Sequence, residues 1–142
     1  MIRVVIDTSV LIRYLIKPSA AIKELIEMRW LNDEIQMISS PELWTEIEGV
    51  LGREYIRELV LPQEGQVLLE AIALKAKVLS SLGPIPSYSR DPKDDKFVAC
   101  ALAGEATYVI TVDRDLLVLG SIGGVRMVTP SEFVALLEDI ES

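Results

Sequence analysis

The 142-residue sequence contains no histidine and a single cysteine, Cys100. The absence of histidine excludes Ser-His and Cys-His nucleophile pairs, histidine metal sites and imidazole acid–base catalysis. One cysteine cannot form an internal disulfide, and because Cys100 lies in an apolar helical pattern we expect it in the core. Any catalysis by this chain must therefore use carboxylates, hydroxyls or a metal ion.

Long hydrophobic runs are also missing. Hydrophobic residues make up 50% of the chain, but charged residues interrupt every apolar run well before the ~18 residues that a membrane-spanning helix needs. The apolar run that ends at Asp7 is too short for the apolar region of a signal peptide. We therefore expect a cytoplasmic protein in which residues 1–142 form one domain around one core.

Positive charge is scarce as well. The chain has 14 basic and 22 acidic residues, which gives a net charge of −8. Its overall charge therefore does not attract nucleic acid. Binding of a nucleic acid would need a local group of basic residues or bridging cations.

The pattern of apolar residues predicts an α/β protein. Residues 2–6 and 107–112 are almost continuously apolar, which is typical of strands covered on both faces, and residues 35–38 and 125–128 are shorter candidates. Strands that alternate with helices predict a parallel sheet. Residues 82–92 contain three prolines and predict an ordered crossing loop. Helical patterns cover residues 19–31, 41–51, 53–60, 63–81, 92–103 and 131–140.

Acidic residues follow the two strongest strand candidates. Asp7 ends the first, and Asp113 follows the second, with Asp115 two residues later. Each of them could simply cap a helix that begins there. Loops at the carboxyl ends of parallel strands, however, form the ligand crevice of such sheets, so these acids are expected to converge. Converging carboxylates in a chain without histidine indicate a Mg²⁺ or Mn²⁺ site.

Two helical patterns bring further acids. Glu46 lies at the edge of the apolar stripe of residues 41–51, where a carboxylate needs a cation or a hydrogen-bond partner unless it reaches water. Asp94 and Asp95 lie in the first turn of residues 92–103, where acids also interact favourably with the helix dipole. Helical phase turns Asp95 toward the packed face, so Asp95 is the preferred ligand of the two.

Three segments resemble the PIN-domain nucleases, in particular the small ribonuclease toxins of prokaryotic toxin-antitoxin pairs. They are VVIDTSVL at 4–11, PELWTEIEGVL at 41–51 and RDPKDDKFVACALAGEATYVITVDRDLL at 90–117. The resemblance implies a three-layer α/β/α sandwich with a central parallel sheet. It also implies an acidic quartet that is both catalytic and metal-binding, with two supplementary acids. The quartet comprises Asp7, Glu46, Asp95 and Asp113, and the supplementary acids are Asp94 and Asp115.

The activity implied by the resemblance is hydrolysis of RNA phosphodiester bonds by an endonuclease that depends on one or two Mg²⁺ or Mn²⁺ ions. Thr8, Ser9 and Thr111 match positions where the family commonly has small polar residues near the site. Val112 departs from the polar or basic residue of many relatives. Five basic residues near the acids in sequence are candidate contacts to RNA phosphates. They are Arg13, Arg90, Lys93, Lys96 and Arg114.

For a toxin, the resemblance implies a cognate antitoxin as partner and a homodimer. Residues 19–31 hold more apolar side chains than one stripe requires, so this helix, including Leu25, is the first candidate for the dimer interface. The alternative function is a non-catalytic PIN-like module that only binds protein. A phosphoryl-transfer receiver domain fits poorly, because no suitably placed strand-end lysine is evident.

Overall fold

A computed structural model describes all 142 residues and contains one six-stranded sheet. The strand order is β3-β2-β1-β4-β6-β5. Neighbouring strands are parallel except β5 and β6, which are antiparallel. The parallel sheet expected from the sequence is therefore confirmed. The strands are β1 (Ile2–Ile6), β2 (Ile35–Ser39), β3 (Lys77–Val78), β4 (Tyr108–Ile110), β5 (Ser121–Ile122) and β6 (Val125–Val128).

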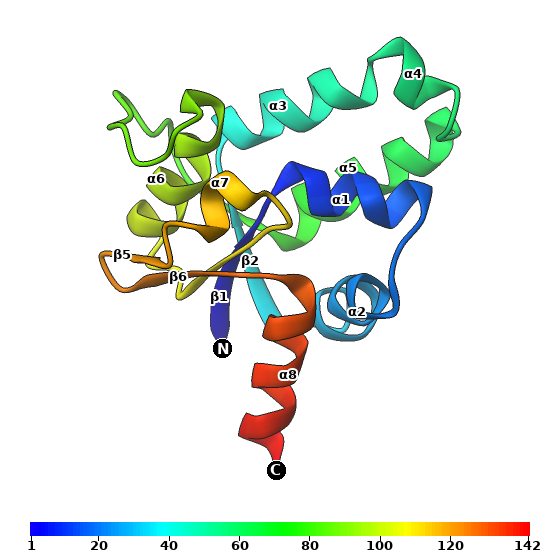
Figure 1. Cartoon of the computed structure of the whole chain (residues 1–142). Coiled ribbons are helices and arrows are strands. Elements are labelled where there is room, and N and C mark those ends of the chain that lie inside the picture. Colours follow the sequence, from blue (N-terminus) through cyan, green and yellow to red (C-terminus); the bar gives the residue numbers. More distant parts are fainter.

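Helices cover both faces of this sheet (Figure 1). In the view of Figure 1, α6 and α7 lie to the left of the sheet, whereas α1, α2, α5 and α8 lie to its right. The α-helices are α1 (Thr8–Ile16), α2 (Ala20–Lys23), α3 (Pro41–Leu51), α4 (Glu54–Arg57), α5 (Pro62–Lys75), α6 (Asp95–Ala103), α7 (Arg114–Leu117) and α8 (Pro130–Glu141). A π-helical segment, η1 (Glu24–Trp30), continues α2, and a 3₁₀ turn, η2 (Pro92–Asp94), precedes α6.

The core is divided by the sheet into two clusters, as the expected α/β/α layering requires. Val4 of β1 packs into the cluster on the side of α1, η1, α5 and α8. Val5 packs into the cluster on the side of α6 and α7. Successive side chains of a strand point to opposite faces, so the consecutive apolar residues Val4, Val5 and Ile6 are buried on both faces of the sheet. Cys100 is fully buried in the second cluster, as expected.

Several boundaries differ from the sequence-based expectations. The helix expected at 63–81 ends at Lys75, because Ala76 has an extended conformation and residues 77–78 pair with β2. The helix expected at 53–60 shortens to α4, and the strand expected at 107–112 shortens to β4. Strand β5 was not expected from the sequence. It forms a hairpin with β6 through Gly123 and Gly124, whose positive φ angles of 54° and 84° suit such a tight turn.

The expectation that residues 19–31 present Leu25 at a dimer interface is wrong. Leu25 and Ile26 have no exposed surface, and Trp30 is 1% exposed. The segment packs against β2 and also against α1 and α8, so more than one stripe of it is covered. Its surplus apolar side chains therefore belong to the core, and Met28, at 55% exposed, is the large apolar side chain of η1 that faces outward.

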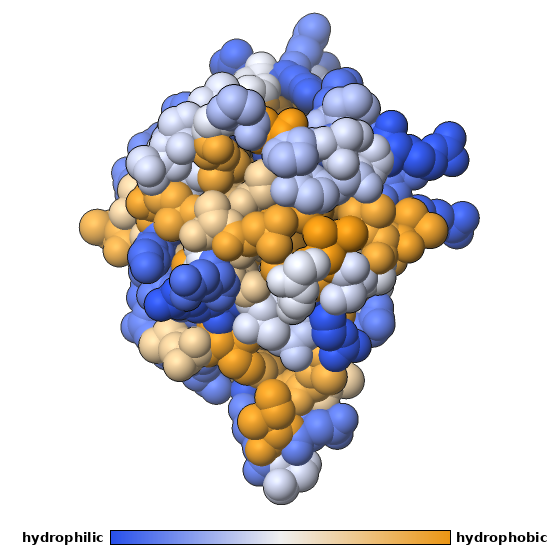
Figure 2. Space-filling view, turned by 90° about the vertical axis from the view of Figure 1, so that its left-hand side faces the viewer, coloured by the Kyte–Doolittle hydropathy of each residue, from blue (hydrophilic) through white to orange (hydrophobic).

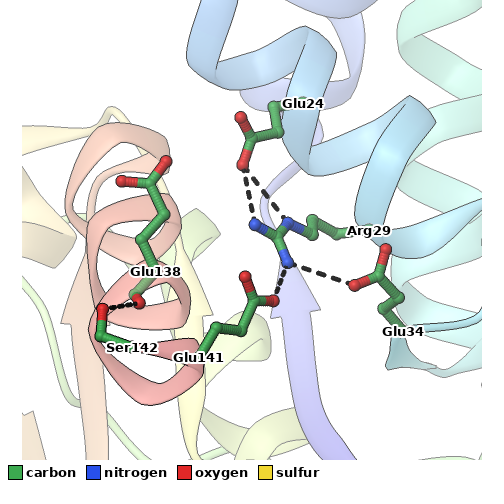
Figure 3. A network of polar contacts seen from close by, with 6 residues as sticks. All are labelled: Glu24, Arg29, Glu34, Glu138, Glu141 and Ser142. Atoms are coloured by element: carbon green, nitrogen blue, oxygen red, sulfur yellow. Dashed lines mark hydrogen bonds and ion pairs between the residues drawn. The ribbon is translucent and has the colours of Figure 1, made fainter.

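A buried arginine joins this segment to the end of the chain (Figure 3). Arg29 of η1 forms ion pairs with Glu24 at 3.1 Å, with Glu34 at 3.2 Å and with Glu141 of α8. The hydrogen bond to Glu141 is the largest cause of the raised pKa of the Arg29 guanidinium. One planar guanidinium thus fastens α8 to η1 and to the loop before β2.

Replacing this arginine tests whether it holds α8 in place. We expect Arg29→Met to lower the free energy of unfolding by about 1–2 kcal/mol, because three carboxylates lose a shared partner while the partly exposed ones keep their hydration. Urea denaturation followed by circular dichroism measures the change. Glu141→Gln removes one of the three contacts and should lower the free energy of unfolding by less. An equal loss in both variants would contradict the inference that Arg29 stabilises the fold through all three carboxylates.

Candidate functional site

The carboxyl end of β1 places Asp7 in the interior. Asp7 is 4% exposed and caps α1, accepting hydrogen bonds from the backbone N–H of Ser9 at 3.3 Å and from its hydroxyl at 2.9 Å. The hydroxyl of Thr111 donates a third hydrogen bond, at 2.7 Å, to the same carboxylate. Thr111 Oγ1 also accepts from the backbone N–H of Asp113 at 2.9 Å. One hydroxyl therefore connects the acids that follow β1 and β4.

Glu46 approaches this region from α3. Its Oε2 accepts a hydrogen bond from the hydroxyl of Thr8, next to Asp7. Its Oε1 forms an ion pair with the ammonium group of Lys96 on α6, at 2.9 Å. The partner expected for Glu46 from its place on the helix is thus supplied by two groups within the chain.

The two neighbouring aspartates at the start of α6 have different surroundings. Both are buried: Asp94 is 7% and Asp95 4% exposed. Asp95 Oδ1 accepts hydrogen bonds from the backbone N–H groups of Tyr88, at 3.0 Å, and Ser89, at 2.7 Å. Asp94 instead lies against Asp113 and close to Asp7, and its Oδ2 is buried without a hydrogen-bond partner. Asp94 therefore lies beside Asp113 and within the electrostatic influence of Asp7, whereas Asp95 is directed to the loop before η2.

Two further acids border Asp94. Asp113 caps α7 through the backbone N–H of Asp115, at 2.8 Å. Ligand oxygens of Asp115, Asp94 and Asp91 lie within 4.8 Å of one another. Asp91 caps the η2 turn, because its carboxylate accepts a hydrogen bond from the backbone N–H of Lys93 at 3.0 Å. Asp91 also lies beside Asp94, because of the fold of the η2 turn. Helical periodicity in the sequence does not indicate this proximity.

Burial and mutual repulsion shift the proton affinities of these acids. Burial raises the pKa of Asp7 above its usual value, against the hydrogen bonds from Thr111 and Ser9. Burial, followed by the close approach of Asp113, raises the pKa of Asp94 to about 7. In both groups the low-dielectric surroundings disfavour the charged form, and a cation would favour it.

This shift predicts how the stability of the metal-free protein depends on pH. The folded state keeps the Asp94 proton up to a pKa of about 7, whereas the unfolded chain loses it near the ordinary value of 3.8. Because the folded state binds more protons between these values, its free energy of unfolding should fall as pH rises through that range. No histidine is present to add an imidazole titration. Melting temperatures measured in EDTA at several pH values report how stability depends on pH. If Asp94→Asn showed the same dependence as wild type, the dependence would not arise from Asp94.

The five candidate phosphate contacts do not share one environment. Lys96 has a side chain that is 17% exposed, and it pairs with Glu46 while donating to the carbonyl of Lys93. The other four are exposed and form no ion pair: Arg13, Arg90, Lys93 and Arg114. They remain candidates for contacts to a polyanion.

The donor set fits a hard divalent cation. Carboxylate and hydroxyl oxygens line the site, and thiol and imidazole groups are absent from it. None of the aspartates at positions 7, 91, 94, 113 and 115 forms an ion pair with a lysine or arginine. The buried, unpartnered Oδ2 of Asp94 is a group that such a cation would satisfy.

Comparisons with known proteins concern the fold and the family of the chain. The crystal structure of VapBC2 from Rickettsia felis bound to a DNA fragment from their promoter contains a similar fold, with a TM-score of 0.57 and 12% sequence identity. The similarity covers 89% of this chain and 97% of that one. No curated protein matches the sequence. No helix is both long enough and apolar enough to cross a membrane. The sequence profile of the PIN domain family matches residues 3–115, and the chain therefore belongs to that family.

Proposed function

We propose that this protein is a ribonuclease that hydrolyses RNA phosphodiester bonds with the help of Mg²⁺ or Mn²⁺. The single observation that carries the proposal is the buried Asp94, which lies beside Asp113 and within the electrostatic influence of Asp7, while none of these aspartates forms an ion pair with a lysine or arginine. Membership of a family whose members are generally nucleases supports it. A bound divalent ion would supply Lewis acidity for the activation of water and for the stabilisation of negative charge on the phosphodiester.

The residues of the site have distinct proposed roles. Asp7, Asp94 and Asp113 hold the cation, with Asp94 taking the role that sequence phase assigned to Asp95. Glu46 completes the quartet implied by the resemblance, and Lys96 fixes its position through the 2.9 Å ion pair. Thr111 orients two of the acids, because its hydroxyl contacts both the Asp7 carboxylate and the Asp113 backbone.

A nuclease assay of wild type and Asp7→Asn with Mg²⁺, Mn²⁺ or EDTA tests the proposal. We expect cleavage of single-stranded RNA only with the metals, and a loss of roughly 10²-fold or more in Asp7→Asn because a buried anionic ligand is removed. Asp139→Asn is the matched control, since it removes the same charge from the exposed part of α8. Activity that ignores EDTA, or an unchanged Asp7→Asn, would defeat the proposal.

The alternative is a PIN-like module that binds protein without catalysis. It predicts a melting temperature that does not respond to Mn²⁺, together with partner binding that survives loss of the acids. The lack of an internal cation among the aspartates favours the enzyme, because a binding module has no need to gather buried like charges that repel each other.

RNA is proposed as the substrate because metal ions and exposed basic side chains together could offset the repulsion between the negatively charged protein and RNA phosphates. Arg90 and Lys93 flank Asp91 in sequence, and Arg114 lies between Asp113 and Asp115. These cations can contact phosphates next to the cleaved bond, where a divalent ion would screen the acids. Binding through such contacts should weaken as salt concentration rises.

A cognate antitoxin is proposed as partner, and a groove offers a place for it. The groove has a volume of about 360 Å³ and lies between α1, η1 and α5. Most of its lining is apolar, and Tyr14, Glu27 and Gln63 add polar groups to it. An apolar segment of a partner would fit the apolar lining of the groove.

A homodimer is also proposed. Because the helix at 19–31 is buried in the core, the interface is proposed to be an exposed apolar surface elsewhere on the molecule. The face that carries α6 and α7 shows a band of apolar surface between more polar areas (Figure 2). Val118, directly after α7, is 75% exposed, and Ile85 of the crossing loop is 36% exposed. Apolar surface of this kind often marks a protein interface.

A further inference from the structure

One cationic group at the site belongs to the chain itself. The ammonium group of Lys96 on α6 lies 2.9 Å from Oε1 of Glu46. It also donates a hydrogen bond to the backbone carbonyl of Lys93. The side chains of the pair are only 17% and 24% exposed, so solvent screens their attraction less than that of a surface pair. Lys96 therefore neutralises Glu46 from within the chain.

Both carboxylate oxygens of Glu46 have partners. Besides the contact of Oε1 with Lys96, Oε2 accepts a hydrogen bond from the hydroxyl of Thr8, the residue after Asp7. Glu46 is also close enough to Asp7 for their negative charges to repel each other. A divalent cation held by Asp7 would attract the carboxylate that Lys96 holds and would repel the ammonium group. The cation and Lys96 would then compete for Glu46.

A hollow beside the pair offers the ammonium group a second position. It has a volume of about 440 Å³ and is lined by Pro41, Glu42, Thr45, Glu46 and Lys96. The lining therefore includes hydroxyl and carboxylate oxygens that can accept hydrogen bonds from an ammonium group. A lysine ammonium is carried on a flexible four-carbon stem, so it can reach a new acceptor without movement of the backbone.

We propose that Lys96 is an exchangeable counter-ion, which holds Glu46 in place before a divalent cation binds and is displaced by that cation into the adjacent hollow. Through this exchange Glu46 always has a cationic partner, and a partly buried carboxylate is never left unpaired. The proposal rests on the proposed function for the presence of a divalent cation at Asp7, but it does not require that RNA be the substrate. A purely structural ion pair predicts the opposite effect, because loss of Lys96 would then loosen Glu46 and weaken binding of the cation.

Mn²⁺ titration of the intact protein tests the exchange without any assay of activity. Electron paramagnetic resonance of the free Mn²⁺ gives the affinity. We expect Lys96→Met to bind Mn²⁺ about tenfold more tightly than wild type, because the competing cation is removed. Lys93→Met is the matched control, since it removes the same charge from an exposed position three residues away. Because solvent and salt screen that charge, its loss should change the affinity by about twofold or less.

The gain in affinity should depend on Glu46. In a Glu46→Gln background, Lys96→Met should tighten Mn²⁺ binding no more than Lys93→Met does, because the carboxylate for which the cations compete is missing. Lys96→Gln removes the charge but keeps an N–H donor, and it provides a second variant in case Lys96→Met does not fold. Melting in EDTA verifies folding. Unchanged or weaker Mn²⁺ binding in the folded Lys96 variants, or the same gain with and without Glu46, would overturn the proposal.

The outcome separates from that of the proposed function, because RNA cleavage is measured independently. Tighter Mn²⁺ binding by Lys96→Met, in a protein that cleaves no RNA, would support the exchange and refute the ribonuclease. Metal-dependent cleavage of RNA, together with an unchanged Mn²⁺ affinity in Lys96→Met, would do the reverse. A wild-type protein that binds no Mn²⁺ would overturn both.

Discussion

Asp94→Asn is expected to abolish metal-dependent RNA hydrolysis, whereas Asp95→Asn should retain most of it. The two residues are adjacent and both are buried, but Asp94 lies against Asp113 whereas Asp95 binds the backbone of Tyr88 and Ser89. Loss of a carboxylate from the cation site should lower kcat by roughly 10³-fold, and loss of a positioning carboxylate by about tenfold.

The same pair should change stability in opposite directions. In EDTA near pH 8, Asp94→Asn should raise the melting temperature, because it removes a buried negative charge that burial and Asp113 disfavour. Asp95→Asn should lower the free energy of unfolding by about 1–2 kcal/mol, because charge-assisted hydrogen bonds to two backbone N–H groups are weakened. Addition of Mn²⁺ should stabilise Asp95→Asn but not Asp94→Asn.

Steady-state cleavage of a labelled RNA and thermal melting with and without Mn²⁺ measure both effects on the same samples. Each variant is the control for the other, since both replace one buried carboxylate by an amide at the start of α6. A greater loss of activity in Asp95→Asn than in Asp94→Asn would return the ligand role to Asp95.

Leu25→Ala is expected to destabilise the protein strongly. Leu25 has no exposed surface and belongs to the cluster between the sheet and α1, α5 and α8. Removal of a fully buried leucine side chain costs the transfer free energy of its atoms and leaves a cavity, about 3 kcal/mol or more. For a chain of this size, that loss corresponds to a fall in melting temperature of roughly 10 °C.

Met28→Ala is the control on the same π-helical segment. Met28 is 55% exposed, so its truncation should change the free energy of unfolding by less than about 0.5 kcal/mol. Urea denaturation in EDTA compares the two variants, and solution scattering reports their association. Unchanged stability of Leu25→Ala together with loss of a dimer would reinstate this helix as an interface.

Much of the sheet could be predicted because strands buried on both faces have an unmistakable pattern. The almost continuous apolar runs at β1 and β4 indicated parallel strands, and their carboxyl ends located Asp7 and Asp113. Strand β5 escaped prediction because two residues with intermediate or high exposure carry too little apolar pattern. Strand β3 escaped for the same reason, and the helical pattern before it continued past the true end of α5.

Helical phase predicted that Glu46 needs a partner and that Asp95 is buried, but it did not indicate that Asp94 is buried beside Asp113. Glu46 lies inside α3, where about 100° per residue holds over the whole helix, and its need for a partner is met by Thr8 and Lys96. Asp94 ends a 3₁₀ turn, in which the residues advance by about 120° each, so the phase of α6 cannot be extended back to it.

The sequence by itself excluded histidine and internal disulfide chemistry and determined the layered α/β fold and the positions of Asp7 and Asp113 at strand ends, because composition and strand periodicity are local properties. Tertiary structure alone decided that Asp94 lies against Asp113, that Lys96 neutralises Glu46, and that Leu25 belongs to the core. These outcomes depend on which segments pack together across long separations in the chain. A local pattern states which face of an element is buried, but the partner on that face is set by packing.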